Sequence, residues 1–136
     1  MTKRYNVNRG YMKLDVWKES VELFHEVYVA LKQIPDLDFR LRSQINDAIQ
    51  SVSANIAEGY CRRTINEYLQ YLNIALGSLG EGLTRLIGLT SVNLLSQEVF
   101  EIIDKKHYSV ENKLVALVRS LQAKRRERTW EEEFRS

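Results

Sequence analysis

The sequence predicts an all-α protein folded as an up-down-up-down antiparallel four-helix bundle, and three observations support this class. Proline occurs once and glycine six times in 136 residues, which is too few for the many turns of a β-sandwich or barrel. Apolar residues recur at steps of three and four in four successive segments, as on one face of a helix. Short corners separate these segments, and short connections place consecutive helices antiparallel. The length suits one compact domain.

The first helix is expected to start at residue 14 and to close at Pro35, because proline disfavours helical geometry at the residue before it. Its apolar stripe comprises Leu14, Trp17, Val21, Phe24, Tyr28 and Leu31. The second helix is expected to start within residues 36–38, where two aspartates suit the helix dipole. It should end at Gly59, a natural C′ residue. Its apolar face comprises Leu41, Ile45, Ala48, Ile49, Val52 and Ile56.

Residues 65–93 form the third predicted helix. Thr64 precedes its first turn and Glu67 lies within it, and this is the spacing of a capping box. Residues 64–95 contain only three charged side chains but four glycines, and each glycine costs about 1 kcal/mol relative to alanine inside a helix. We therefore expect this helix to be buried on more than one side, with another helix close to its glycines. These are Gly77, Gly80, Gly82 and Gly88.

The fourth helix should begin near Ser96, which suits an N-cap. Its apolar stripe comprises Val99, Ile103, Val110, Leu114, Leu117 and Leu121. A separate helix starting at residues 109–111 stays open, although the stripe keeps its register there and favours one continuous helix. Residues 1–13 are then a flexible basic arm, 14–123 the bundle, and 124–136 a charged tail. In the tail, Trp130 and Phe134 are four residues apart and could dock on a neighbour.

Charge and cysteine content exclude several classes of protein. The net charge of +2 does not by itself demand a polyanionic partner. One cysteine excludes an internal disulfide and agrees with a reducing compartment. No apolar run has the length of a membrane span, and the N-terminus lacks the apolar region of a signal peptide. We expect a bacterial-type cytoplasmic protein without membrane contact.

Four polar residues of the second and third helices are candidates for a shared layer: Asn55, Glu58, Ser78 and Glu81. One interpretation is a pocket of an undetected enzyme or small-ligand binder. The other is a structural layer that satisfies buried polar groups and sets helix register. The second is favoured, because one carboxylate and one amide are not an acid–base pair. We expect no catalytic residue and no enzyme activity.

Metal and thiol chemistry have weak support. His25 and His107 are isolated in sequence, and no Cys/His/Asp/Glu grouping has metal-ligand spacing. Cys61 could be a nucleophile, because neighbouring positive charge such as that of Arg62 and Arg63 activates a thiol, but no histidine lies near it in sequence. Cys61 is therefore interpreted as a plain corner thiol. No metal or cofactor is expected.

Basic residues gather at the N-terminal arm, at one corner and near the C-terminus. Each run by itself is typical of a solvated surface, but an oligomer would repeat all of them and make a multivalent surface. Binding to RNA or DNA would then be weak, indifferent to sequence, backbone-directed and sensitive to salt. The candidate residues are Arg62, Arg63, Lys124, Arg125 and Arg126.

Three segments resemble signature blocks of a known family. They are residues 14–17 (LDVW), residues 51–59 (SVSANIAEG) and residues 74–79 (IALGSL). The blocks are similar to those of four-helix bundle proteins of the S23, or 23S-rRNA-intervening-sequence, type. The resemblance extends over about residues 11–123.

The resemblance implies a bacterial four-helix bundle without known activity. A related group, the accessory variability determinants of diversity-generating retroelements, forms homopentameric rings that associate with a reverse transcriptase and with nucleic acid. The resemblance thus implies a homo-oligomer, with a pentamer favoured and a dimer as the alternative. It also implies a reverse transcriptase as one possible partner. The expected function is a non-catalytic oligomeric scaffold for protein interaction or for nucleic acid.

Overall fold

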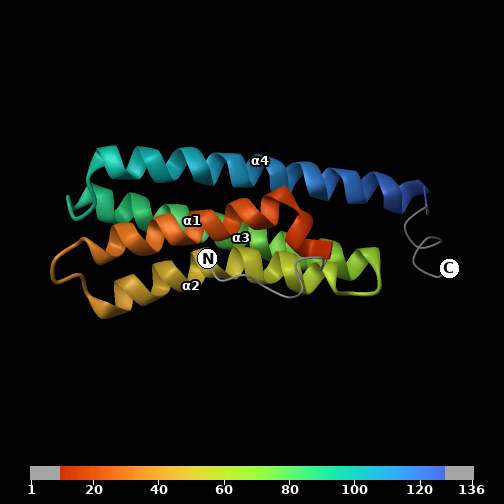
Figure 1. The fold of residues 1–136 in the computed structure, drawn as a ribbon, viewed down its shortest axis with the longest axis horizontal. Coiled ribbons are helices and arrows are strands. Elements are labelled where there is room, and N and C mark those ends of the chain that lie inside the picture. Colours follow the sequence, from red (N-terminus) through yellow and green to blue (C-terminus); the bar gives the residue numbers. More distant parts are fainter. Residues whose placement is uncertain (1–9, 128–136) are drawn as a thin grey trace.

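The computed structural model describes residues 10–127, and in these residues it contains helices and no strand. The elements in chain order are η1 (Gly10–Lys13), α1 (Asp15–Lys32), α2 (Phe39–Tyr60), α3 (Ile65–Ser91) and α4 (Gln97–Glu127). Each helix packs on the next, and α4 returns to contact α1 (Figure 1). The predicted up-down-up-down bundle is confirmed. No helix in this part of the chain is both long and apolar enough to cross a membrane.

The two ends of the bundle differ in what they carry (Figure 1). The α1–α2 and α3–α4 connections lie together at one end, which we name the loop end. The α2–α3 connection lies at the opposite end, together with the end of α4, and we name it the corner end. The helices lengthen along the chain, from 18 residues in α1 to 31 in α4. An α-helix rises about 1.5 Å per residue, so α4 is about 20 Å longer than α1.

Helical structure begins earlier in the chain than the sequence predicts. Residues 10–13 form a 3-10 turn in which Met12 is buried. The ring of Tyr11 packs edge-on against the rings of Trp17 and Tyr60, with distances between ring centres of 5.6 and 6.3 Å, respectively. These apolar contacts anchor a segment that was expected to be part of the flexible basic arm. The remainder of that arm, residues 1–9, lies outside the described residues, as do 128–136 with Trp130 and Phe134.

The buried stripe of α1 is rotated relative to the predicted one. Its fully buried positions are Val16, Ser20, Leu23, Val27 and Leu31. Trp17 and Phe24 pack only partly against the core, and Tyr28 is exposed. Ser20 can occupy a core position because its hydroxyl donates to the backbone carbonyl of Trp17, at 2.7 Å. The aromatic residues of α1 therefore lie at the border of the core, and not at its centre.

Local capping residues begin three helices, and two of them, Thr64 and Ser96, were predicted as caps. Asp38 accepts hydrogen bonds from the N–H groups of Arg40 and Leu41 before α2, at 2.8 and 3.2 Å. Thr64 accepts from the N–H of Glu67 at 3.1 Å, and Ser96 accepts from that of Val99 at 3.2 Å. These bonds satisfy N–H groups that have no partner within the helix. Helix α4 then runs without a break through residues 104–110 and past residue 123.

Gly59 does not end α2, contrary to the prediction. It lies inside the helix with a negative φ. A Cβ atom there would lie 2.8 Å from the Cβ of Tyr71 and 3.2 Å from the carbonyl oxygen of Tyr68. Gly59 is therefore required for the close approach of α2 to α3.

The glycines of α3 fall into two groups. A Cβ atom on buried Gly82 would overlap the side chain of Ile49 in α2, so this glycine sits at the predicted close helix contact. Gly77, Gly80 and Gly88 have no neighbouring atom within 4 Å of such a Cβ atom. Close packing inside one copy of the chain thus explains only Gly82.

His107 is a core residue. It is 1% exposed and fills the position between Ile103 and Val110 in the buried stripe of α4. Its Nε2 lies 2.7 Å from the carbonyl oxygen of Leu79 and, because a carbonyl only accepts, must carry the donated proton. Val99, predicted to belong to this stripe, is 36% exposed. The hydrogen bond to α3 lets a polar ring occupy an apolar seam.

The contact at Gly59 can be tested with a pair of opposite substitutions in α2. Gly59→Ala should lower the free energy of unfolding by about 1–3 kcal/mol, because the added methyl group meets atoms fixed to the α3 backbone. Ala54→Gly, at an exposed position of the same helix, should lower it by about 1 kcal/mol through helix propensity alone. Urea unfolding curves measure both. A stabilised Gly59→Ala variant would show that propensity, rather than the α3 contact, governs this position.

Candidate functional site

Three side-chain cross-links connect α2 and its corner to α3, and we name them the polar seam. They join Arg62 to Tyr71, Ser51 to Ser78, and Gln44 to Arg85. The α3 members are seven residues apart, at 71, 78 and 85. The α2 positions 44, 51 and 58 are also seven apart and run in the opposite order, with Glu58 holding Arg62. Seven residues are about two helical turns, so the seam keeps two antiparallel helices in one register.

The middle cross-link brings two of the predicted layer residues together. The hydroxyl oxygens of Ser51 and Ser78 lie 2.7 Å apart. Asn55 donates from its amide nitrogen to the carbonyl oxygen of Ser51 at 2.8 Å and to its hydroxyl at 3.0 Å. Asn55 therefore reaches Ser78 through Ser51, which the sequence analysis did not include. The spacing of seven between Gln44 and Ser51 is the signal that could have identified it.

The two predicted carboxylates do not join this layer. Glu58 is 52% exposed and pairs with Arg62 at 2.5 Å, one helical turn further on. Glu81 is 53% exposed and pairs with Arg85 at 3.1 Å in the same manner. The four residues therefore do not converge on a pocket between α2 and α3. The hydroxyl and amide groups of the middle cross-link bond to one another, an arrangement suited to holding register rather than to proton transfer.

Arg62 has a structural role at the α2–α3 connection. Its guanidinium donates to the hydroxyl of Tyr71 at 2.6 Å and lies 4.8 Å from the centre of that ring. Partial burial by itself lowers the pKa of Arg62, but the nearby Tyr71 and Glu58 outweigh it and raise that pKa above its ordinary value. Arg62 is thus a charged structural residue, whereas Arg63 and Cys61 beside it are exposed.

The corner end gathers basic residues from two distant parts of the sequence. Arg125 donates from Nη1 to the side-chain oxygen of Asn66 at 3.0 Å, which places the last turns of α4 beside the start of α3. Lys124 and Arg126 are exposed on the same turn of α4. The predicted basic residues 62–63 and 124–126 therefore lie at the same end of the bundle (Figure 1).

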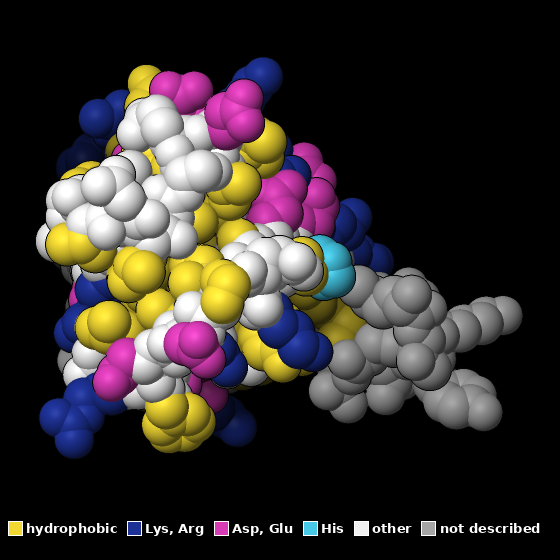
Figure 2. All heavy atoms as spheres, turned by 90° about the vertical axis from the view of Figure 1, so that its left-hand side faces the viewer, with side chains coloured by type: hydrophobic (Ala, Val, Ile, Leu, Met, Phe, Trp, Pro, Cys, Tyr) yellow, Lys and Arg dark blue, Asp and Glu magenta, His cyan; other side chains and the backbone are white. Residues whose placement is uncertain are grey.

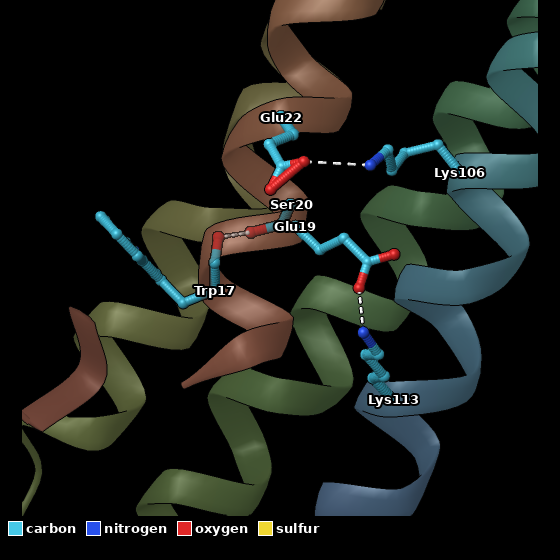
Figure 3. A network of polar contacts seen from close by, with 6 residues as sticks. All are labelled: Trp17, Glu19, Ser20, Glu22, Lys106 and Lys113. Atoms are coloured by element: carbon cyan, nitrogen blue, oxygen red, sulfur yellow. Dashed lines mark hydrogen bonds and ion pairs between the residues drawn. The ribbon is translucent and has the colours of Figure 1, made fainter. Parts of the chain in front are cut away.

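A second polar network lies between α1 and α4 (Figure 3). Glu19 pairs with Lys113, and Glu22 accepts from Lys106 at 3.0 Å. Beside these pairs is a shallow depression of about 370 Å³. It is lined by Glu19, Glu26, Ile102, Lys105, Lys106 and Ser109. The sequence analysis missed it, although acids in α1 and lysines in α4 recur at helical spacing.

The ion pairs shift the pKa values of Glu19 and Lys106 in this network. Burial by itself raises the pKa of Glu19, but hydrogen bonds from Lys113 and Ser109 and the charge of Lys113 outweigh it and lower that pKa. The hydrogen bond to Glu22 raises the pKa of Lys106. The lowered pKa keeps the Glu19 carboxylate charged and paired with Lys113 at neutral pH. In residues 10–127, no group of three His, Cys, Asp or Glu side chains could hold a metal ion.

The lowered pKa of Glu19 predicts a pH-dependent contribution to stability. The ordinary value is 4.5, so the contribution is complete above that pH and is lost as the pH falls through the lower value of the folded state. Glu19→Gln should therefore lower the melting temperature at neutral pH and leave it unchanged well below pH 4.5. Thermal unfolding followed by circular dichroism measures this. Glu22→Gln, at a more exposed pair, should have the smaller effect, and an equal loss at both pH values would contradict the assignment.

The fold has a counterpart among solved structures. It is similar to the crystal structure of a protein with unknown function from the S23 ribosomal protein family of Bacteroides thetaiotaomicron, with a TM-score of 0.72 and 23% sequence identity. The match covers 76% of this chain and 97% of that chain. At this identity the likeness shows the fold alone.

Family membership follows from the sequence match. No curated protein matches the chain. The family model of the 23S rRNA-intervening sequence proteins matches residues 12–116, which include α1, α2, α3 and the first two thirds of α4. Because this match covers most of the sequence, the chain belongs to the 23S rRNA-intervening sequence protein family.

Proposed function

We propose that this protein is a non-catalytic, cytoplasmic scaffold that assembles with copies of itself and presents its corner end to the backbone of RNA or DNA. The observation that carries the proposal is the hydrogen bond between Arg125 and Asn66. It gathers the basic residues of α4 and of the α2–α3 corner at one end. Segments 59 positions apart in sequence thus contribute to a single charged surface.

The outer face of α3 supports assembly. Gly77, Gly80 and Gly88 are open on this face, and Ile74 is 46% exposed. A glycine inside a helix costs about 1 kcal/mol relative to alanine, and three of them need a compensating contact. A helix of a second copy could approach closely there, because the face carries few charges and no bulky side chain at the glycines. The resemblance to ring-forming relatives favours a pentamer, with a dimer as the alternative.

Repetition of the corner end in an oligomer would strengthen its attraction for a polyanion. Arg63, Lys124 and Arg126 are exposed there, and each copy added to the assembly repeats them. Their contacts would be to phosphate groups, which carry no sequence information. Binding should therefore be weak for one copy, indifferent to base sequence and sensitive to salt.

The oligomer is tested by light scattering coupled to gel filtration. The wild-type protein should have a multiple of the monomer mass at micromolar concentration. Gly80→Arg should reduce the mass, because a large charged side chain prevents close approach at α3. Ala116→Arg, at an exposed position of α4, is the matched control and should keep the wild-type mass. A monomeric wild-type protein would refute assembly through α3, and so would a Gly80→Arg variant of wild-type mass and helix content.

Nucleic-acid binding is tested with the triple variant Arg63→Gln, Lys124→Gln and Arg126→Gln. Arg62 is left intact because it holds the corner through Glu58 and Tyr71. The variant should bind all RNA and DNA sequences more weakly by a similar factor. The slope of log K against log salt should fall by roughly one for each phosphate group that the variant no longer binds.

The matched control for charge is the triple variant Lys32→Gln, Arg40→Gln and Lys105→Gln, all exposed and away from the corner end. It has the same net charge as the test variant and should keep wild-type affinity. Gel retardation over a salt series measures both. No retardation of RNA or DNA by the wild-type protein at low salt, where attraction is strongest, would exclude this part of the proposal.

A further inference from the structure

One acidic residue at the contact between α1 and α4 has no partner. Figure 3 shows the two ion pairs that Glu19 and Glu22 of α1 form with lysines of α4. Glu26 lies one helical turn beyond Glu22 and forms no hydrogen bond or ion pair within residues 10–127. Its Oε2 atom is buried. The row of ion pairs along α1 therefore ends before the last acidic side chain of this helix.

The unpaired carboxylate of Glu26 is unfavourable for the bundle itself. A buried acceptor without a partner costs free energy, and the cost is larger for a charged group. The hydrogen bond to Glu22 raises the pKa of Lys106, and the charge of Glu26 adds to this effect. Glu26 thus lies near a lysine that is already paired with another residue. A polar group that breaks the pairing rule in this way is typical of a functional position.

Glu26 lines the depression between α1 and α4, and this depression retains one free charge on each wall. Its volume of about 370 Å³ is near the lower limit for small-molecule sites. Two of its four charged lining residues, Glu19 and Lys106, are already in ion pairs. The other two are Glu26 on α1 and exposed Lys105 on α4, which forms no ion pair among the described residues. The free groups therefore have opposite signs.

An apolar side chain lies between these charges in the wall that α4 supplies. Ile102 is 65% exposed, so a ligand that covers it removes apolar surface from water. The depression extends toward the loop end, because Glu26 is near the end of α1 and Ile102 near the start of α4. Figure 2 views this end and shows both acidic and basic side chains on it. Complementarity therefore favours a ligand that carries both signs of charge.

We infer that the depression binds a small zwitterion, a molecule with an ammonium group, a carboxylate and a hydrocarbon part. Free amino acids belong to this class. The ammonium group donates to Glu26, the carboxylate accepts from Lys105, and the hydrocarbon part packs on Ile102. The last torsion of a glutamate side chain rotates freely, so the carboxylate can turn its buried oxygen toward the ligand. Because the depression is shallow and Lys105 is exposed, binding should be weak, with a Kd of about 1 mM.

This site is separate from both surfaces of the proposed scaffold. Neither the open glycines of α3 nor the basic residues of the corner end line the depression. Gly80→Arg should therefore bind the zwitterion as the wild-type protein does. The inference and the proposed function can each fail without the other.

Titrations followed by the NMR signals of the backbone amides test the inference. The probes are L-leucine and ε-aminocaproate, whose ammonium and carboxylate groups are separated by different distances. At least one of them should shift the signals of residues that line the depression. Glu26→Gln should weaken this binding about tenfold, because a hydrogen bond to a charged group is lost. Lys105→Gln should weaken it about threefold, because this partner is exposed.

Two sets of controls accompany the titrations. Glu101→Gln and Arg119→Gln remove charges of the same signs from exposed positions of α4 outside the depression, and both should keep wild-type affinity. Analogues that lack the carboxylate or the ammonium group should bind more weakly than the zwitterion. They are isoamylamine and isocaproate for leucine, and pentylamine and caproate for ε-aminocaproate. Without a ligand, Glu26→Gln should keep the wild-type melting temperature, because Glu26 has no partner in the bundle.

Three results would overturn the inference. The first is that neither zwitterion shifts the signals around the depression, or that Glu26→Gln binds as tightly as the wild-type protein. The second is an amine analogue that binds as tightly as its zwitterion and is unaffected by Lys105→Gln, because the site would then recognise a cation alone. The third is a ligand-free Glu26→Gln variant whose melting temperature falls as far as that of Glu19→Gln. That result would assign the carboxylate of Glu26 to the stability of the bundle instead of to a ligand.

Discussion

The close contact between α2 and α3 is the constraint on which the bundle depends. Gly59 of α2 lies against Tyr71 and Tyr68, and Gly82 of α3 lies against Ile49. Because these two glycines lie on opposite helices, both backbones can approach along most of the shared length. The polar seam then fixes the axial position of this pair. Helices α1 and α4 pack on α2 and α3, respectively, and against each other, so their positions follow from the same contact.

Local sequence signals predicted the helices better than their buried faces. Asp38, Thr64 and Ser96 cap helices through bonds to residues two or three positions away, which a short sequence window contains. Gly59 was misassigned because the same residue type suits a helix end and a close helix contact, and only the position of α3 distinguishes them. Core positions of Ser20 and His107 depend on bonds to backbone carbonyls, at Trp17 and Leu79, that composition does not reveal.

The sequence predicted the contact between α2 and α3 where both residues lay on helix faces that the apolar pattern had already placed against each other. Asn55 and Ser78 do lie in one layer, but they meet through Ser51. Glu58 and Glu81 each pair with an arginine four residues further along the chain, and this local pairing outweighs convergence across the interface. The meeting of residues 62–63 with 124–126 depends on the antiparallel order of the helices and on the length of α4. The sequences of residues 62–63 and 124–126 do not by themselves reveal the helix order or the length of α4.

The ion pairs between α1 and α4 have a consequence for the order in which the chain folds. Glu19 and Lys113 are 94 positions apart, whereas α2 and α3 are joined by a corner of four residues. Loop closure is favoured entropically for short separations, so an α2–α3 hairpin can form early and the α1–α4 seam closes last. The α1–α4 contact that closes last is held in part by ion pairs in which one partner is largely exposed to solvent, and such pairs contribute little to stability. Transient opening of the native bundle should therefore start at α1 and α4, with the α2–α3 hairpin intact.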